Sequence, residues 1–344
     1  LVSRFVGFLA LGIGLAMLVP ASVAGLDSDG QSAIAFATSA GISVLIGWIL
    51  VQLGKRAGGS LVGPREAIGI VGFSWILAGL LGGIPFVLDN SVSHPVDAIF
   101  ESFSGFTTTG ATVIPNLYDD PGVVADPASN GKTVATISRA AMLWRSITQW
   151  LGGMGVIMLG LLILTRVLGG GMSLARAELT GPSLSRLGPT LQWTARRLWL
   201  IYVVLTVLEM GLLHFLGGMG TFDAVNYSLT TLPSGGFGTS DAGIMGFESA
   251  RIEVILMLFM LLTCINFSLL HLILAGRTKE ALKDEELRTY LLILLLAWLA
   301  MAFNLYRAGT NGGAEELAPL EAIRHALFQS ISISSTGYSS ADFA

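Results

Sequence analysis

The sequence predicts an all-α protein that crosses a membrane several times. Of its 344 residues, 53% are hydrophobic and only 12% are charged, and the mean hydropathy is +0.72. A soluble domain carries about a quarter charged residues, so this chain lacks the charge that would keep its surface in water. The single cysteine, Cys264, excludes an internal disulfide framework and a thiolate metal cluster. The order of apolar runs and basic loops along the chain supports the same fold class.

Long apolar runs give the expected membrane helices. A helix needs about 20 mostly apolar residues to cross the hydrocarbon core. The runs that meet this requirement are 5–21, 33–53, 67–88, 141–165, 198–217, 252–275 and 290–306. The first run could also be read as a signal peptide, but it has no convincing cleavage site followed by a polar segment. We therefore expect each of these seven runs to be one membrane-spanning helix.

Basic residues are concentrated in alternate loops between these runs. Cytoplasmic loops of membrane proteins carry an excess of lysine and arginine. The basic loops hold Lys55, Arg56 and Arg65, then Arg166, Arg176, Arg186, Arg196 and Arg197, then Arg277, Lys279, Lys283 and Arg288. The intervening loops are mostly acidic, and Lys132 is the exception. This distribution predicts a cytoplasmic N-terminus.

Three of the predicted outer loops share an internal repeat. In each, an alanine is followed four residues later by a serine and, seven or eight residues further on, by a glycine. The three sets are Ala98, Ser102 and Gly110; Ala224, Ser228 and Gly236; and Ala326, Ser330 and Gly337. The repeating unit is a span, a half-length semi-polar helix, a glycine-containing turn and a second span.

Such a unit suits a re-entrant loop that binds a cation. Non-helical backbone at membrane depth is tolerated only where protein buries it or where it lines a watery cavity. The carboxyl end of a short helix carries partial negative charge, and a following strand can turn its carbonyls toward an ion. No carboxylate lies within residues 107–112. Neutral oxygens favour a large monovalent cation over calcium or magnesium, which prefer carboxylates.

The loop sequences resemble those of one transporter superfamily. "FESFSGFTTTGATVI" (100–114) and "RSITQWLGGMGVIML" (145–159) are similar to the TrkH-like ion-conducting subunits of the Trk/Ktr/HKT potassium transporters. "TTLPSGGFGTSDAGI" (230–244) and "SISSTGYSSADF" (332–343) resemble the later pore loops of that family. The resemblance covers essentially the whole chain. It implies an initial two-helix unit followed by four helix–pore loop–helix repeats around a central, pseudo-fourfold pore.

The resemblance also implies a division of the chain. We expect an initial two-helix transmembrane unit at 1–60, a first repeat at 61–172, a cytoplasmic linker at 173–194, a second repeat at 195–280 and an incomplete third repeat at 281–344. The chain ends at Ala344, so the second helix of the third repeat and the fourth repeat are absent. A truncated or incompletely assigned chain is the simplest explanation. Because four filter strands close the ring in this family, we expect that this sequence alone does not conduct ions.

The candidate K⁺ filter residues follow from the same resemblance. They are Thr108, Thr109 and Gly110 in the first loop, Ser234, Gly235 and Gly236 in the second, and Ser335, Thr336 and Gly337 in the third. Glycine in all three loops resembles the potassium-preferring pattern, whereas serine in the first would indicate sodium. Either Gly235 or Gly236 could be the second filter glycine. Gly236 is favoured because it precedes an aromatic residue, as Gly337 does.

The implied function is potassium uptake across the cell inner (plasma) membrane, without an enzymatic reaction. K⁺ is the transported ion, and we expect no cofactor in this chain. The resemblance implies a homodimer in the lipid bilayer and a cytoplasmic, nucleotide-binding regulatory subunit of the TrkA/KtrA kind. The resemblance implies that the basic stretch 174–197 contacts that subunit, and the alternative is a tethered loop on the anionic leaflet. We expect no nucleic acid partner, and the sequence leaves coupling to protons or sodium open.

Two other functions explain less of the sequence. An intramembrane serine protease would use Ser234 with His214 or His271, but it accounts for one loop and leaves the other two unexplained. An alternating-access carrier also uses broken helices near the membrane midplane, but its repeats are usually inverted. The three loops here all enter from the same side.

Three charged residues within or near the spans have open roles. Glu209 lies in the middle of the fifth run, and an intramembrane acid is a functional candidate by default. It could also pair with His214 or with a polar group on a neighbouring helix. Arg139 and Arg145 lie near the outer end of the fourth run, where we expect them to snorkel or to bind loop carbonyls.

Overall fold

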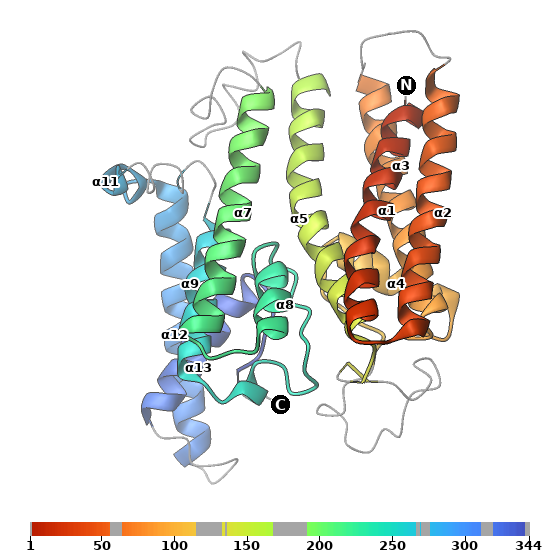
Figure 1. The fold of residues 1–344 in the computed structure, drawn as a ribbon. Helices are drawn as coiled ribbons and strands as arrows, with labels where there is room; N and C mark the ends of the chain where they lie inside the picture. Colours follow the sequence, from red (N-terminus) through yellow and green to blue (C-terminus); the bar gives the residue numbers. More distant parts are fainter. Residues whose placement is uncertain are drawn as a thin grey trace. The chain divides into compact units, whose positions relative to one another are not determined.

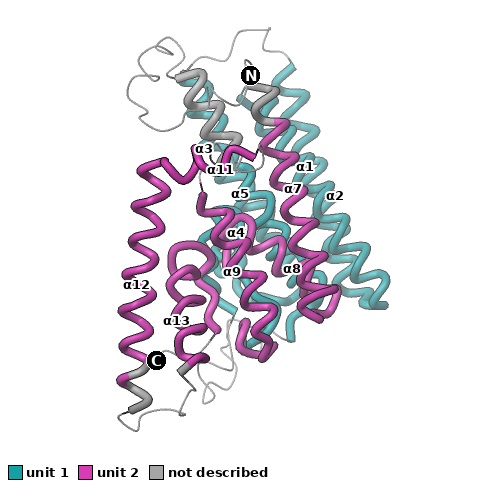
Figure 2. The backbone as a smooth tube through the Cα atoms, turned by 90° about the vertical axis from the view of Figure 1, so that its left-hand side faces the viewer, with its two compact units in different colours: residues 1–177, 237–242 teal, residues 178–236, 243–344 magenta. Residues whose placement is uncertain are grey.

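The computed structural model describes residues 2–55, 64–114, 133–134, 136–167, 191–265, 269, 276–310 and 319–340. Within these ranges the backbone forms helices, turns and irregular segments and contains no β-strand, in agreement with the predicted all-α fold. The chain divides into two compact units, which Figure 2 shows in different colours. Unit 1 comprises residues 1–177 and 237–242, and unit 2 comprises residues 178–236 and 243–344.

Unit 1 begins with a closely packed helical hairpin. Helices α1 (Val2–Leu26) and α2 (Gly30–Lys55) run side by side along their whole length (Figure 1). A Cβ added to Gly47 would lie 2.8 Å from the carbonyl oxygen of Gly7, and a Cβ on Gly7 would lie 2.8 Å from that of Gly47. Small residues allow this approach of two helix backbones in a membrane, where packing replaces the hydrophobic effect as the driving force. The hairpin is therefore held by backbone contact.

The rest of unit 1 is a helix, a short helix and a second long helix. These are α3 (Pro64–Leu88), α4 (Pro95–Phe106) and α5 (Arg139–Val167). Helix α4 begins with Pro95, which suits the first helical turn because its missing N–H would have no helical acceptor there. With 12 residues, α4 is roughly 18 Å long and too short to cross a bilayer. It packs against α3 and α5, and a Cβ on Gly152 would lie only 2.0 Å from the Phe106 carbonyl oxygen.

Unit 2 has five main helices, which are 11 to 26 residues long. Its main helices are α7 (Leu191–Phe215), α8 (Thr221–Thr231), α9 (Ala250–Cys264), α12 (Glu285–Thr310) and α13 (Pro319–Ile333). The 3₁₀ turn η4 (Met245–Phe247) and helix α11 (Thr278–Ala281) lie between them. Helix α8 packs on α7 and α9, and α13 packs on α9 and α12 (Figure 1). Apolar side chains from all five main helices form one buried cluster, which includes Leu213, Tyr227, Leu256, Leu294 and Phe328.

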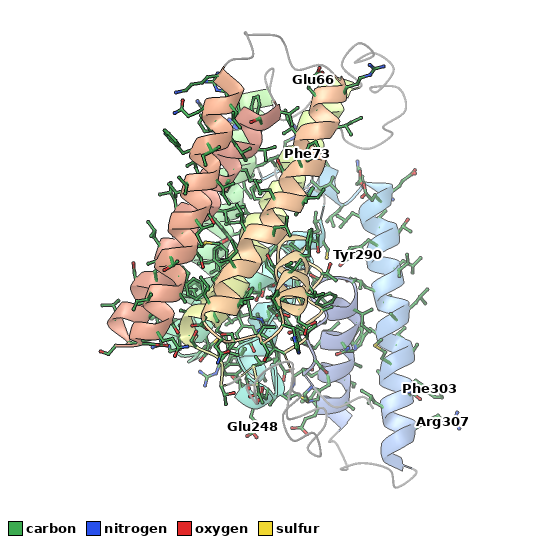
Figure 3. All side chains as sticks on the ribbon, turned by 90° about the vertical axis from the view of Figure 1, so that its right-hand side faces the viewer. Glu66, Phe73, Glu248, Tyr290, Phe303 and Arg307 are labelled. Atoms are coloured by element: carbon green, nitrogen blue, oxygen red, sulfur yellow. The ribbon has the colours of Figure 1, made fainter. Side chains whose placement is uncertain are left out.

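Five helices in the described ranges are long and apolar enough to cross a membrane. They cover Val2–Leu26, Gly30–Lys55, Arg65–Leu88, Arg196–Phe215 and Glu285–Leu305. Each matches one of the predicted runs, and the chain is a multi-pass membrane protein. Figure 3 shows Phe73 on α3 and Phe303 on α12, whose side chains are 60% and 63% exposed. Large exposed apolar side chains of this kind are expected on helix faces that contact lipid.

Of the two remaining predicted runs, one forms a single helix and the other does not. The run at 141–165 lies within the single helix α5. The prediction of one unbroken helix over 252–275 is wrong, because α9 ends at Cys264 and Ile265 has extended backbone angles (φ −77°, ψ 135°). Ile265 is β-branched, and such residues favour extended backbone more than other apolar residues do. Most of 266–275, including His271, lies outside the described residues.

Candidate ion-binding site

The first candidate filter segment leaves α4 through a left-handed turn. The Thr109 N–H donates to the Ser104 carbonyl (2.9 Å) and the Thr108 N–H to the Gly105 carbonyl (2.9 Å). This pair of bonds is the Schellman motif, which ends a helix with a left-handed residue that is usually glycine. Here that residue is Thr108, with φ 56°. A β-branched residue in this conformation costs about 1–2 kcal/mol, so the surrounding structure must hold it there.

The second segment leaves α8 in the same way. The Gly235 N–H donates to the Thr230 carbonyl (2.8 Å), and the Ser234 N–H donates to the Thr231 carbonyl (2.9 Å). Ser234 has φ 57° and Gly236 has φ 84°, whereas Gly235 does not have a positive φ. In the first segment Thr108 and Gly110 have φ 56° and φ 75°. Positive φ thus occurs at the first and third residues of both segments.

The third segment has a different turn at the end of α13. Both the Ser335 and Gly337 N–H groups donate to the Ser332 carbonyl, at 2.9 Å and 2.8 Å. Gly337 has φ 77°, and it alone has a positive φ within 335–337. The spacing from Ala326 to Gly337 is one residue shorter than the spacing from Ala224 to Gly236. The third segment is therefore without the left-handed serine or threonine of the other two segments, but its glycine has a similar positive φ.

The second and third segments lie against each other within unit 2. The Ser234 and Ser335 hydroxyl oxygens are 3.2 Å apart. A Cβ on Gly236 would lie 2.0 Å from the Thr336 carbonyl oxygen, which is closer than any side chain could come. A Cβ on Gly337 would have no atom within 4 Å. Glycine is therefore required at position 236 by both its backbone angle and its neighbour, and at position 337 by its backbone angle alone.

Serine hydroxyls on two short helices hold the backbone just after the glycine. In unit 1 the Ser104 hydroxyl donates to the Ala111 carbonyl, directly after Gly110. In unit 2 the Ser332 hydroxyl donates to the Tyr338 carbonyl (2.6 Å), directly after Gly337. These serines are not among the site residues predicted from the sequence. The signal was present, because a serine precedes the glycine by six residues in the first loop and by five in the third.

A buried ion pair fixes the backbone that follows the first segment. Arg145 on α5 and Glu101 on α4 are 2.7 Å apart, and their side chains are 2% and 0% exposed. The Glu101 carboxylate also accepts from the Thr112 hydroxyl (2.9 Å) and the Val113 N–H (3.1 Å). Removal of one partner from a buried pair costs about 3–5 kcal/mol, because it leaves an uncompensated charge. The role of Glu101 was not predicted, although an acid within the short helix was visible in "FESFSG".

The same arginine holds residues that follow the second segment. Within unit 1, Arg145 donates to the Gly238 carbonyl (3.4 Å), and its guanidinium lies 4.1 Å from the centre of the Phe237 ring. Gln149, one turn further along α5, accepts from the Phe237 N–H (3.3 Å). The expectation that Arg145 binds a loop carbonyl is thus confirmed. Arg139 instead pairs with Asp27 (2.7 Å) at a more exposed position.

The contacts of Ser234 and His214 in the described part of the chain do not support the serine protease interpretation. The Ser234 hydroxyl contacts Ser335. The Nδ1 atom of His214 lies 2.9 Å from the Met219 carbonyl, beside the end of its own helix. His271, the other candidate base, lies outside the described residues.

Comparisons with known proteins agree with this arrangement. The family model described as "TrkH: Cation transport protein" matches residues 57–344. The Trk system potassium uptake protein TrkH of Halomonas elongata is 36% identical over 100% of this chain and 67% of its own length. The protein of the same name from Escherichia coli K12 is 34% identical over 97% of this chain and 65% of its own length.

A solved structure is similar over the same extent. The crystal structure of the potassium transporter TrkH from Vibrio parahaemolyticus superposes with a TM-score of 0.79 and 32% identity, covering 100% of this chain and 66% of that one. The chain thus spans about two thirds of the length of the relatives it matches. Those relatives are named as transport proteins, in agreement with the expectation of transport without an enzymatic reaction. The match of a family model to more than half of the chain shows that it belongs to the TrkH cation transport family.

Proposed function

We propose that this chain contributes the K⁺ filter of a potassium uptake protein, at residues 108–110, 234–236 and 335–337. The names of the relatives and the likeness to a solved potassium transporter support this function. In the proposed arrangement the filter segments surround one central pore with pseudo-fourfold symmetry. K⁺ is the transported ion, and the chain needs no cofactor to bind it.

The observation that carries the proposal is the repeated sign of φ. Thr108 and Gly110, and likewise Ser234 and Gly236, have positive φ on either side of a residue that does not. In a regular strand successive carbonyls point to opposite sides, but a reversal of handedness at every second residue turns them toward the same side. A row of carbonyls on one side of the backbone is what replaces the water shell of a K⁺ ion. The carboxyl ends of α4 and α8, with their partial negative charge, immediately precede these rows.

The charge around the first segment also supports a monovalent ion. Glu101 is the acid nearest to this segment in the sequence, and its charge is already compensated by Arg145 at 2.7 Å. The oxygens left for an ion are then the neutral carbonyls and the hydroxyls of Thr107, Thr108 and Thr109. Calcium and magnesium bind such sites poorly without carboxylates, whereas K⁺ does not require them.

The cellular setting of the proposal extends the sequence-based expectations. The protein lies in the cell inner membrane with its N-terminus in the cytoplasm, forms a homodimer, and binds a nucleotide-binding subunit of the TrkA/KtrA kind on its cytoplasmic face. The positive-inside rule supports the orientation, since Lys55, Arg277, Lys279 and Arg288 lie at or beyond the same predicted ends of the spans. The term "Trk system" in the names of the relatives supports a multi-component transporter. Most of the linker at 173–194 lies outside the described residues.

The substitution Gly110→Ser tests the filter assignment. A side chain at φ 75° strains the backbone by about 1–2 kcal/mol, so we expect roughly a tenfold fall in the preference for K⁺ over Na⁺. Initial rates of K⁺ and Na⁺ uptake would be measured with the protein as the cell produces it, in a strain without other K⁺ uptake systems. Gly12→Ser is the matched control, because Gly12 lies in α1 with open space around it. An unchanged ion preference at normal membrane levels of Gly110→Ser would contradict the assignment.

A further inference from the structure

Four polar residues of unit 2 form a group just beyond the third filter segment. Glu253 on α9 and Arg324 on α13 form an ion pair, with 2.8 Å between the Oε2 and Nε atoms. His325, the next residue on α13, contacts both Arg324 and Ser340, which follows Gly337 by three positions. Glu253, His325 and Ser340 are 5%, 8% and 5% exposed. The filter geometry described above uses none of these four residues.

The hydrogen bonds of His325 determine which ring nitrogen carries the proton. The Arg324 Nη2 atom lies 3.2 Å from Nε2 of the ring, and the Ser340 hydroxyl oxygen lies 3.0 Å from Nδ1. A guanidinium group can only donate, so Nε2 must accept and has no proton. The proton of the neutral ring is then on Nδ1, which donates to Ser340. The Glu253 carboxylate, 3.9 Å from Nδ1, favours a proton on this nitrogen as well.

The first and third loops are held at similar points after the glycine. In the first loop a serine on the short helix binds the residue after the glycine, and Glu101 binds Thr112, two positions after it. In the third loop a serine again binds the residue after the glycine, and His325 binds Ser340, three positions after it. An ion pair between the short helix and a neighbouring helix lies at this second contact in both loops. The acid is on the short helix in the first loop and on the neighbouring helix in the third.

We propose that His325, with its proton on Nδ1, binds Ser340 and so positions the backbone that follows the third filter glycine. The ion pair of Arg324 and Glu253 fixes the orientation of the ring. His325 is a positioning residue and does not contact the ion. This inference rests on the proposed function, since it assigns a role in K⁺ selection.

Two amides in place of His325 test which ring nitrogen acts. The amide nitrogen of asparagine is bonded to Cγ, as Nδ1 is, whereas that of glutamine lies one bond further along, closer to the place of Nε2. For His325→Asn we therefore expect a K⁺ over Na⁺ preference within about twofold of the native value. His325→Gln should lower the preference about fivefold, because the donor to Ser340 is lost. Side-chain packing alone would favour glutamine, which is closer to histidine in size.

Substitutions at both ends of the hydrogen bond complete the test. His325→Leu and Ser340→Ala each remove one partner and are expected to lower the preference about fivefold. The double variant should be no worse than the more impaired single variant, because both changes break one interaction. His94→Gln is the matched control, since His94 is exposed before α4 and makes no capping hydrogen bond with its side chain. Initial rates of K⁺ and Na⁺ uptake would be compared at equal membrane levels, in the strain used for Gly110→Ser.

Each outcome decides the proposal. Equal losses in His325→Asn and His325→Gln would overturn it, as would additive losses in the double variant. If the His325 variants do not reach the membrane, Ser340→Ala decides, and an unchanged preference there counts against the proposal. A response to Gly110→Ser without a response at His325 or Ser340 would overturn the positioning role and leave the filter assignment standing. No response at any of the three positions would overturn both.

Discussion

Gly236 and Gly337 have similar backbone angles, φ 84° and φ 77°, but very different neighbours. The Thr336 carbonyl occupies the space that a side chain at position 236 would need, whereas position 337 faces open space. The sequence argument for Gly236 over Gly235 relied on the aromatic residue that follows it. The positive φ at Gly236 supports the same choice on independent physical grounds. Its role in binding an ion stays a prediction.

This difference gives a prediction at the residue scale. Gly236→Ala must displace a backbone carbonyl, so we expect K⁺ uptake to fall to background. Gly337→Ala meets only the strain of its backbone angle, about 1–2 kcal/mol, and should keep measurable uptake. The two initial rates would be compared at equal amounts of protein in the membrane. Equal uptake by the two variants would mean that the contact with the Thr336 carbonyl does not constrain the filter.

The side-chain partners around the candidate filter segments could not be predicted from the sequence. The glycines and threonines recur at a fixed spacing, which makes them visible as a repeat. Glu101 and Arg145 are 44 positions apart, and neither belongs to the residues that recur in the three loops. No periodicity in the sequence therefore connects them. Their pairing depends on how α4 packs against α5, which the chain specifies only through tertiary contacts.

At the element scale, the hairpin of α1 and α2 shows how glycine position decides its role. Gly47 faces the backbone of α1, with the Gly7 carbonyl and the Leu11 N–H each 2.8 Å from the place of its Cβ. Gly41 lies on the same helix with nothing within 4 Å. The two residues are chemically identical in the sequence and differ only in the helix face that they occupy.

We predict opposite effects of alanine at these two positions. Gly47→Ala should lower the thermal stability of the purified protein, because the two helices must move apart. Gly41→Ala should leave stability unchanged or raise it by up to about 1 kcal/mol, since alanine is the better helix former. Thermal unfolding in one detergent would measure both. A destabilisation by Gly41→Ala as large as that by Gly47→Ala would contradict the close backbone contact.

The sequence predicts which segments form short helices better than it predicts where a long helix ends. The short helices α4, α8 and α13 follow from semi-polar segments that are too short to span the bilayer, and the structure contains all three. The end of α9 at Cys264 was not predicted, because hydropathy continues without interruption through Ile265. Apolar composition reports where a segment is buried and carries little information on a local change of backbone angles.

At the scale of the whole molecule, the loop charges predict the orientation in the membrane. On a Cys264→Ser background, a cysteine in place of Lys279 should react with an impermeant maleimide only after the membrane is opened. A cysteine at Glu248, an exposed position after the second filter segment, should react from the outside in intact cells. The opposite pattern would reverse the proposed orientation and would place any regulatory subunit on the wrong face.

The sequence does not predict which residues make up each of the two compact units. The predicted domains are contiguous stretches, and their boundaries stay predictions. The compact units are not contiguous, since residues 237–242 belong with the first 177 residues. A repeat in the sequence shows which segments are alike, but it does not show which segment completes the packing of another.

The placement of residues 237–242 has a consequence for how the protein is made. Their hydrogen bonds to Arg145, Gln149 and Thr133 join positions 88 to 108 residues apart. At roughly 5–20 residues per second, a ribosome needs on the order of 5–20 s to add that much chain. During this interval Arg145 has its carboxylate partner but lacks the Phe237 ring and the Gly238 carbonyl. Residues 237–242 thus complete their packing on a helix that was synthesised earlier, and the order of synthesis becomes part of the assembly of unit 1.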